Sequence, residues 1–407
     1  MMKNNKFLIL LILYLFVFLN FNVESQRNSN CKLDFNELLF QVKVRRYMKI
    51  MDAPSVVACV IENNSIIHSY SFGYQNIYQL KKATLDSIYV IGSNSKVVTS
   101  TAILQLFEKG LIGLDNNIND YLPFEIVNPK HPDINITLRM LLSHQSSLGD
   151  NLGDIKYYYK YINNCSKWIK ERLTVDGELF REQYWKDYEP GQKNHYSNIG
   201  FIIVSYLVEI ISGQKFEDYC QEHIFIPLEM YNTSFQKEKL NSDMLARPYY
   251  PLFSRIFIPL VNYDIGCIAP CGGLRTNVKD LSHFLIAHME DGAWNNVQIL
   301  KEHTVKEMHR IQYPDESMDF YGGVLQHGLG WVHFNIYDSE WEGYYGGAVG
   351  YDCNMIIRKS DRTAIILLAN GHFLRPKGPI SNKISFFRFK TCFNLNVLLI
   401  QNALKNQ

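Results

Sequence analysis

The chain carries almost no net charge, and this argues against nucleic acid as a binding partner. Its 407 residues include 41 Lys and Arg against 40 Asp and Glu, for a formal net charge of +1 at pH 7. No basic stripe stands out along the sequence. Proteins that bind nucleic acid present a clustered basic surface, so the composition predicts no nucleic-acid partner.

The sequence also lacks internal repeats, low-complexity linkers and cysteine pairs of the C-x-x-C type. The spacing of its eight cysteines suits no zinc site. In an oxidising compartment some of the cysteines can pair, but the sequence does not choose among the many connectivities.

Long apolar runs are scarce. The one that stands out, residues 7–19, follows Lys3 and Lys6 and is shorter than the roughly 20 residues that a membrane-spanning helix needs. It has the length of a signal h-region, so residues 1–25 are predicted to be a signal peptide cleaved near Ser25. An uncleaved N-terminal anchor is the alternative interpretation.

Glycosylation sequons agree with export. The four Asn-x-Ser/Thr sequons lie at Asn63, Asn135, Asn164 and Asn232. We therefore expect a secreted glycoprotein, or one in the lumen of the secretory pathway, with no stable membrane insertion after signal cleavage.

Strand patterns lie at both ends of the chain, with mostly helical patterns between them. Residues 55–71 predict two strands with a turn at Asn63-Asn64. Helical spacing predicts helices over 94–109 and 199–211. Further strands are expected at 328–334, 351–357 and 364–368, and a final helix at 394–404. This order predicts an α/β (α+β) core interrupted by a helical insertion.

The first candidate catalytic motif is Ser93-Asn94-Ser95-Lys96, at the start of a predicted helix. Residues three apart on a helix share a face, so Lys96 can reach the Ser93 hydroxyl. A serine becomes a good nucleophile when a base takes its proton, and a lysine does this only when its pKa lies well below about 10.4. The alternative is a capping serine beside a solvated lysine.

The second motif is Tyr196-Ser197-Asn198, just before the predicted helix 199–211. A tyrosine hydroxyl near a lysine ammonium shares its proton with it, and the two titrate as a coupled pair. Asn198 can donate to a substrate carbonyl and accept from Lys96. The alternative is a core tyrosine followed by an asparagine N-cap.

The surroundings of these motifs make the pattern specific. The run I-G-S-N-S-K-V-V-T-S-T-A-I-L-Q-L-F-E-K-G-L-I-G-L-D, from Ile91 to Asp115, resembles the nucleophile helix of the serine β-lactamase and penicillin-binding-protein superfamily. The likeness is greatest to the class C β-lactamase-related branch, in which the second motif is Tyr-x-Asn. Four further stretches fit in the same order: I-T-L-R-M-L-L-S-H from Ile136, P-G-Q-K-N-H-Y-S-N-I-G-F from Pro190, I-F-I-P-L-E-M-Y-N-T-S-F from Ile224 and C-G-G-L-R-T-N-V-K-D-L-S-H-F from Cys271.

The resemblance implies a fold and its division into two subdomains. We expect a β-lactamase/transpeptidase-like fold with an antiparallel sheet, flanking helices and a helical insertion. Residues 26–110 and 325–407 would form the sheet subdomain and 111–324 a mainly helical subdomain, together one domain. The active site would lie in the cleft between them.

It also implies residue roles. Ser93 would be acylated, Lys96 and Tyr196 would form the proton network, and Asn198 would orient Lys96 and the substrate. The family's third motif, Lys/His-x-Gly followed by another glycine, matches Tyr344-Tyr345-Gly346-Gly347. The backbone N–H groups of Ser93 and Gly347 would then form the oxyanion hole, with Tyr344 and Gly346 bordering the substrate.

At Tyr344 the sequence departs from its family. A cationic or imidazole side chain is usual there and helps to hold a substrate carboxylate, whereas a tyrosine brings no charge. A smaller departure is Gln145-Ser146-Ser147, where the family usually has Thr-Ser-Gly in a mainly structural motif. The other histidines considered are interpreted as structural or surface residues: His144, His195, His283, His327 and His372.

We therefore expect a secreted serine hydrolase that forms an acyl-enzyme with an ester or amide substrate, including peptides. This reaction implies neither a metal nor an organic cofactor. One alternative is a β-lactamase or D-Ala-type carboxypeptidase, which would need a carboxylate anchor other than Tyr344. The non-catalytic alternative is a pseudoenzyme that keeps the fold for binding. Loss of Ser93, Lys96 or Tyr196 would distinguish the pseudoenzyme, and all three residues are present.

Overall fold

The computed structural model describes residues 35–150, 161, 163–252, 256–315, 318–320, 323–336, 339–371 and 379–405. The chain divides into two units, residues 1–43 and 44–407. In the first unit the described residues begin helix α2 (Phe35–Met51). The predicted signal peptide lies outside the described residues, and the fold below is that of the second unit.

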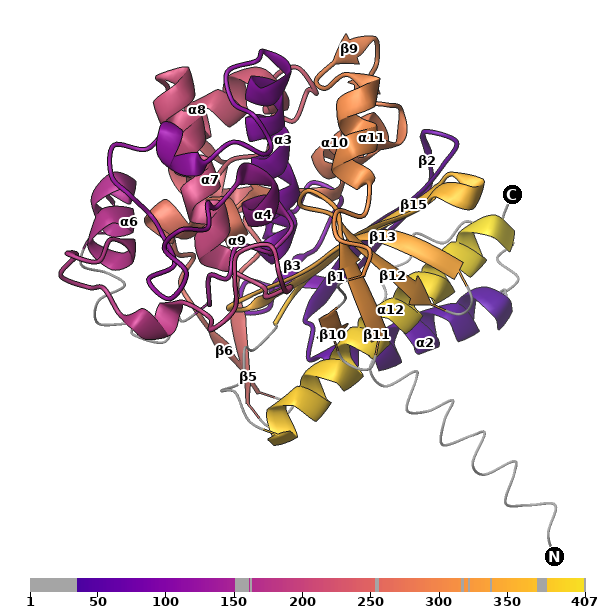
Figure 1. Cartoon of the computed structure of the whole chain (residues 1–407). Coiled ribbons are helices and arrows are strands. Elements are labelled where there is room, and N and C mark those ends of the chain that lie inside the picture. The colour runs from indigo at the N-terminus through magenta and orange to yellow at the C-terminus, as the bar shows by residue number, and fades with distance from the viewer. Residues whose placement is uncertain are drawn as a thin grey trace, which may run out of the picture. The chain divides into compact units, whose positions relative to one another are not determined.

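The second unit is built on a nine-stranded sheet in which every neighbouring pair is antiparallel. Its spatial order is β10-β11-β12-β13-β14-β15-β1-β2-β3, so strands from the two ends of the sequence meet at β15 and β1 (Figure 1). Val56 of β1 lies opposite Ala369 of β15. The strands are β1 (Ser55–Glu62), β2 (Ser65–Asn76), β3 (Lys81–Lys82), β10 (Met318–Phe320), β11 (Gly323–His327), β12 (Val332–Ile336), β13 (Ser339–Ala348), β14 (Tyr351–Arg358) and β15 (Thr363–Asn370).

Both faces of the central strands are covered, because β1 is buried along nearly its whole length. Alternate side chains of a strand point to opposite faces. On one face the Cys59 thiol contacts the Val278 carbonyl of α10. On the other, the Tyr70 hydroxyl of β2 donates to the Leu399 carbonyl of α12 at 3.0 Å. Helix α12 (Pro379–Lys405) crosses this second face (Figure 1).

The helical part contains the buried helices that position the site. Helices α3 and α7 pack against each other and against α9. The helices are α3 (Ser95–Glu108), α4 (Leu138–Leu142), α6 (Cys165–Leu173), α7 (Asn198–Ser212), α8 (Phe216–Cys220), α9 (Ala269–Gly272), α10 (Val278–Met289) and α11 (Glu302–His309). The short strand pairs are β4 (Tyr89–Val90) with β7 (Arg275–Thr276), β5 (Tyr249–Leu252) with β6 (Ile256–Pro259), and β8 (Ala293–Trp294) with β9 (Val297–Gln298).

Most of the predicted elements are confirmed. The helix expected over 94–109 is α3, and the helix expected over 199–211 is α7, which begins after the Ser197 N-cap and ends at Gly213 with φ of 73°. Asn63 and Asn64 both have positive φ, as a tight hairpin turn between two strands requires. The mixed α/β fold with a large antiparallel sheet is the predicted one.

Two boundaries are wrong. The strand expected at 328–334 is a turn followed by β12, because Gly330 has φ of 83° and its N–H donates to the Leu142 carbonyl at 3.0 Å. The final helix is far longer than 394–404, since α12 begins at Pro379.

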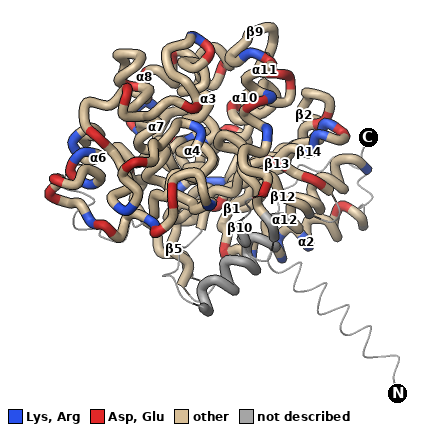
Figure 2. Tube along the Cα trace, viewed as in Figure 1, with Lys and Arg blue, Asp and Glu red and all other residues tan. Residues whose placement is uncertain are grey.

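Two further features concern the surface and the membrane. Basic and acidic residues are interspersed along the trace (Figure 2).

In the described part of the chain no single helix has the length and apolar composition to cross a membrane. One pair bent by 80°, Asn198–Ser212 with Phe216–Phe225, meets the two criteria only when its helices are taken together.

Candidate active site

The nucleophile candidate sits in a tight turn that is pressed against the sheet. Ser93 lies in the short 3₁₀ turn η1 (Gly92–Asn94) that leads into α3, and it is half-buried. Gly92 has φ of 53°, and a Cβ added there would lie 2.7 Å from the backbone nitrogen of Gly347. Only glycine suits both the backbone angle and this close approach of β13.

The two motifs meet at the Ser93 hydroxyl. Lys96, in the first turn of α3, places Nζ 3.1 Å from Ser93 Oγ. Tyr196, just before α7, places Oη 2.6 Å from the same oxygen. Helix spacing explains the first contact, whereas the packing of α7 on α3 makes the second.

Lys96 is completely buried, and its hydrogen-bond partners in the described chain are neutral. Besides Ser93, Nζ donates to Asn198 Oδ1 and to the backbone carbonyl of Cys271, each at 2.6 Å. The ammonium also lies 5.0 Å from the ring centroid of Tyr196 and 5.6 Å from that of Phe201. Three acceptors and aromatic faces therefore fix its position.

Burial keeps Tyr196 in its neutral form in the resting site. Desolvation raises the pKa of Tyr196 well above its ordinary value, although the hydrogen bond with Ser93 acts in the opposite direction. The Tyr196 hydroxyl also donates a hydrogen bond to Asn198 Oδ1 at 3.3 Å. A proton can leave this pair only when another group stabilises the charge that remains.

Asn198 is held in place by a carboxylate that the sequence motifs did not indicate. Asn198 Nδ2 donates to Asp150 Oδ2 at 2.5 Å, and its backbone N–H donates to Asp150 Oδ1 at 3.3 Å. With its amide nitrogen engaged by Asp150, the amide oxygen of Asn198 must face Lys96. Asp150 thus fixes the orientation of an amide that contacts the base.

Strand β13 brings the third motif beside Ser93. In the β13–β14 register Gly346 lies opposite Cys353 and Gly347 opposite Asp352. A Cβ on Gly346 would collide with the Ile91 carbonyl, so the strand can approach η1 only with glycine there. The Gly347 backbone nitrogen consequently lies next to the nucleophile turn, at the edge where the oxyanion hole was predicted.

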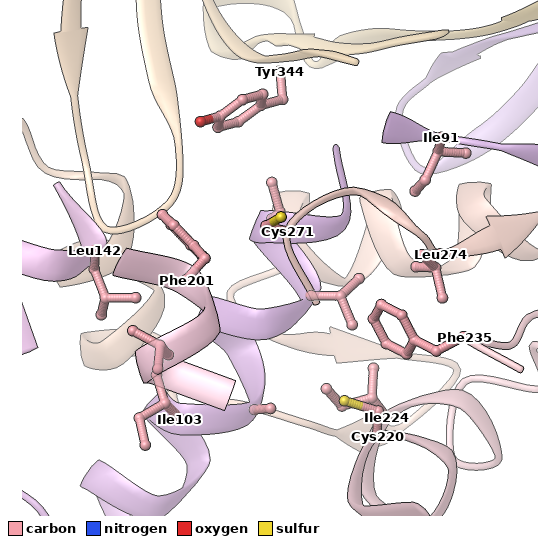
Figure 3. Packing of buried hydrophobic residues seen from close by; sticks show 14 of the residues in the cluster. Ile91, Ile103, Leu142, Phe201, Cys220, Ile224, Phe235, Cys271, Leu274 and Tyr344 are labelled. Atoms are coloured by element: carbon pink, nitrogen blue, oxygen red, sulfur yellow. The ribbon is translucent and has the colours of Figure 1, made fainter. Parts of the chain in front are cut away.

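Tyr344 is buried, only 5% exposed, and its hydroxyl contacts protein groups. Its Oη lies 3.1 Å from His144 Nε2. Figure 3 shows its side chain projecting from the sheet above Cys271 and Phe201. The centroid of the ring is 6.0 Å from Lys96 Nζ.

Sequence reasoning missed three participants: Asp150, His144 and the carbonyl of Cys271. His144 was interpreted as structural or surface, and Cys271 only began a family stretch. Asp150 stands in a polar segment with no motif, so no local signal could have found it. Among the described residues no group of three or more His, Cys, Asp or Glu is placed to hold a metal ion.

Comparison with known proteins identifies the context of this geometry. The family model described as Beta-lactamase matches residues 40–382. The chain is 25% identical to Penicillin-binding protein 4* of Bacillus subtilis over 328 residues, covering 76% of this chain and 66% of that protein. It is also 25% identical to Beta-lactamase-like protein 1 of Dictyostelium discoideum, over 62% of this chain and 51% of that protein. The chain thus spans about half to two thirds of these relatives' length.

Solved structures show the same fold. The octameric penicillin-binding protein homologue from Pyrococcus abyssi aligns with a TM-score of 0.67 at 22% identity, covering 89% of this chain and 78% of that one. A penicillin-binding protein from Bacillus halodurans aligns with a TM-score of 0.64 at 17% identity, covering 85% and 98%.

Proposed function

Because this chain belongs to the beta-lactamase family of serine hydrolases, we propose that Ser93 forms an acyl-enzyme with an ester or amide, including peptide amides, which water then releases. The observation that supports this best is the position of Ser93 Oγ, 3.1 Å from Lys96 Nζ and 2.6 Å from Tyr196 Oη. A serine between an amine and a phenol has what nucleophilic catalysis needs, a base within hydrogen-bond reach.

The geometry supports a stepwise mechanism. The Lys96–Tyr196 pair, once it has lost one proton, takes the proton of Ser93 while Oγ attacks the substrate carbonyl. The carbonyl oxygen becomes an oxyanion, which the N–H groups of Ser93 and Gly347 stabilise. The tetrahedral intermediate collapses as the C–O or C–N bond breaks, and the pair returns its proton to the leaving alcohol or amine. Water then repeats these steps on the acyl group and frees Ser93.

The serine assignment is tested by covalent labelling. A fluorophosphonate probe is expected to label the protein at Ser93 in stoichiometric amount, and Ser93→Ala should abolish the labelling. Ser95→Ala is the matched control, since Ser95 begins α3 two residues after Ser93 and donates to the Gly92 carbonyl at 2.7 Å. Equal labelling of the Ser93→Ala protein would refute the nucleophile.

The substrate preference we propose is for uncharged esters and amides. Tyr344 supplies no cation for a substrate carboxylate, and Arg275 does not supply one either. The Arg275 guanidinium is buried, lies 3.0 Å from Asp264 and donates to backbone carbonyls. A charge-assisted hydrogen bond contributes about 1.5–3 kcal/mol against roughly 1 for a neutral one, so carboxylate substrates would bind about tenfold more weakly or worse.

The names of the relatives favour a second candidate, a β-lactamase or D-Ala-type carboxypeptidase. A hydrolysis panel on purified protein distinguishes the two, with short-chain esters, D-amino-acid peptides and a chromogenic β-lactam. We expect ester turnover to exceed β-lactam turnover in kcat/KM. Efficient β-lactam hydrolysis would overturn the preference but leave the nucleophile intact, while no turnover and no labelling would favour the pseudoenzyme.

We also propose that the protein is exported, on the basis of the apolar run at 7–19 and the sequons. Expressed in a eukaryotic secretory host, it should appear in the medium without its first ~25 residues and lose mass on treatment with a glycosidase. A full-length, membrane-bound product would support the N-terminal anchor instead.

A further inference from the structure

A polar cavity of about 310 Å³ lies outside the cluster formed by Ser93, Lys96 and Tyr196. Its wall comes from the hairpin between β2 and β3 and from the segments 242–247 and 260–262. Small molecules bind in cavities of roughly 300–1,000 Å³, most of which have a largely apolar lining. This cavity is lined mainly by polar side chains, so it suits a hydrophilic ligand.

Arg247 contributes a cation whose outer end is open. Its Nε donates to the Leu260 carbonyl at 3.3 Å, whereas Nη1 and Nη2 have no hydrogen-bond or ion-pair partner in the described part of the chain. Its backbone is fixed as well, because the N–H donates to the Gln75 carbonyl at 2.8 Å and the carbonyl accepts from Asn370 Nδ2 at 3.0 Å. A guanidinium held in this way can offer both terminal nitrogens to two oxygens of one anion.

Lys81 adds a second cation to the same wall. Its Nζ donates to the backbone carbonyl of Asp243, and within the described ranges it forms no ion pair with an acidic side chain. An ammonium has three N–H donors, so two remain available to a ligand. The half-buried side chain is thus directed by a neutral acceptor and keeps its charge uncompensated.

The orientation of Gln79 adds a further donor. The backbone N–H of Gln79 donates to Asn76 Oδ1 at 3.2 Å, which leaves Asn76 Nδ2 as the donor to Gln79 Oε1 at 2.9 Å. The oxygen of the Gln79 amide is therefore occupied. Its Nε2 has no partner among the residues that the structure describes, and an amide nitrogen can only donate.

The acidic residue in the wall, Asp243, is exposed, and its backbone serves the site. Its carbonyl accepts from Lys81 and, at 2.9 Å, from Gln75 Nε2. Gln75 is 3% exposed, and its own oxygen accepts from the Ser87 hydroxyl. Gln75 consequently ties the segment 242–247 to β2, and the open groups of the wall are mostly donors.

We propose that this cavity binds a phosphate monoester, held by Arg247, Lys81 and Gln79. A phosphate monoester has three strong acceptor oxygens and about two negative charges at neutral pH, which matches two cations and an amide donor. A carboxylate has only two oxygens for the same donors. The site uses none of the groups assigned to acyl transfer, so it goes beyond the proposed function and does not depend on it.

The rim of the cavity allows two sources for the phosphate. Leu80 is 74% exposed and Val261 is 77% exposed, one on each side of the polar wall. Tyr78, which is 63% exposed, donates to the Phe257 carbonyl of β6 at 3.1 Å and so lies beside them. A soluble phosphate would use the polar wall alone, whereas a phospholipid headgroup would also bring apolar chains to this rim.

Titration calorimetry with glycerol 3-phosphate at constant ionic strength tests the site on the full protein. We expect saturable binding of one molecule per chain. Arg247→Gln and Lys81→Gln should each weaken it about tenfold or more, because each removes charge-assisted hydrogen bonds. Lys82→Gln is the matched control, since successive side chains of a strand point to opposite faces, and it should stay within about twofold of wild type.

The sign of the charge is tested at Asp243. Asp243→Asn should leave the affinity for glycerol 3-phosphate unchanged or raise it, because it removes a negative charge beside the anion. Weaker binding in this variant would mean that the cavity selects a cation and would overturn the inference. If Arg247→Gln does not fold, Lys81→Gln and Gln79→Leu decide the question, since both side chains are at least partly exposed.

The source of the phosphate is distinguished with vesicles of phosphatidylcholine, with and without phosphatidic acid. Sedimentation with the phosphatidic acid vesicles that glycerol 3-phosphate reverses and Leu80→Ser weakens would identify a lipid headgroup. Binding of glycerol 3-phosphate alone would identify a soluble phosphate, and either result upholds the site. No saturable binding of either probe, or binding that Arg247→Gln and Lys81→Gln leave unchanged, overturns it, whatever the outcome of fluorophosphonate labelling at Ser93.

Discussion

Two of the buried ionisable side chains near strand β13, Glu342 and Lys96, have opposite surroundings. Glu342, on β13 two residues before Tyr344, contacts Lys359 and His309 at 2.9 Å each, while His333 lies 3.9 Å away. Lys96, on the other side of the site, has only neutral hydrogen-bond partners in the described residues. Glu342 is therefore surrounded by basic side chains, whereas Lys96 is held by neutral hydrogen-bond acceptors.

The partners of Glu342 decide its charge. Burial alone would raise the pKa of Glu342, but His309, Lys359 and His333 lower it to about 2, so it stays ionised. His309 in turn lies within 3.3 Å of His288, whose Nε2 is 3.3 Å from the Thr101 hydroxyl on α3. This second cluster ties β13 to the nucleophile helix without taking part in the chemistry. Glu342 is thus a fixed anchor held by charged partners, whereas Lys96 is held by neutral ones.

The largest expected effect separates these roles at Lys96. Lys96→Arg keeps a positive charge but cannot give up its proton, because a guanidinium stays protonated. We expect kcat to fall by about 10²-fold or more in the folded variant. Single-turnover acylation by a neutral ester measures this. Near-normal acylation would contradict the proton-transfer role and erase the contrast with Glu342.

The next effect concerns stability at Glu342. A carboxyl whose pKa falls from 4.5 to about 2 on folding contributes about 3 kcal/mol of stability above pH 4.5, which is lost as the pH drops toward 2. Glu342→Gln should lose most of this stability at pH 7 and show a flatter dependence of unfolding free energy between about pH 5 and 2. Urea unfolding at several pH values is the measurement.

The structural role of Glu342 would be contradicted if Glu342→Gln left the unfolding free energy unchanged and lowered kcat as much as Lys96→Arg does. The expected result is that ester hydrolysis under stabilising conditions stays within about threefold of wild type, because Glu342 touches none of the reacting groups.

The smallest effect is expected at Lys359, the exposed member of the second cluster. Its side chain is 60% exposed, and surface ion pairs contribute about 0–1 kcal/mol. Lys359→Gln should therefore cost less than about 1 kcal/mol of unfolding free energy, and high salt should reduce the difference. A loss as large as that of Glu342→Gln would mean that Lys359, more than His309, compensates the carboxylate.

The sequence predicted the parts of the site that have local spacing. Ser93 and Lys96 are three residues apart at the start of a helix, and Tyr196-Ser197-Asn198 directly precedes a strongly periodic helix. Each motif alone is a weak pattern, and the resemblance of the surrounding stretches to the family is what singled both out. The fold followed from the same stretches by resemblance. What could not be predicted is contact across the chain: Asp150 reaches Asn198 over 48 residues, and His144 reaches Tyr344 over 200.

The contacts of His144 could not be predicted from the sequence, for a physical reason. A histidine beside a helix end is usually structural, and its partners here are a backbone N–H and a tyrosine hydroxyl from the sheet. Only the register of β13 places that hydroxyl within reach. The error at 328–334 has a similar origin, since apolar residues around Gly330 follow a strand pattern while tertiary contacts hold the glycine in a turn.

The pairing of β1 with β15 has a consequence for biosynthesis. Ser55 and Asn370, joined by a hydrogen bond of 2.8 Å, stand 315 positions apart, so the first long strand has no partner on one side until nearly the whole chain has left the ribosome. At about 5–20 residues per second that wait is on the order of tens of seconds. Throughout it β1 would present an unpaired apolar edge. The order of synthesis therefore leaves this edge open to pairing with other chains until β15 arrives.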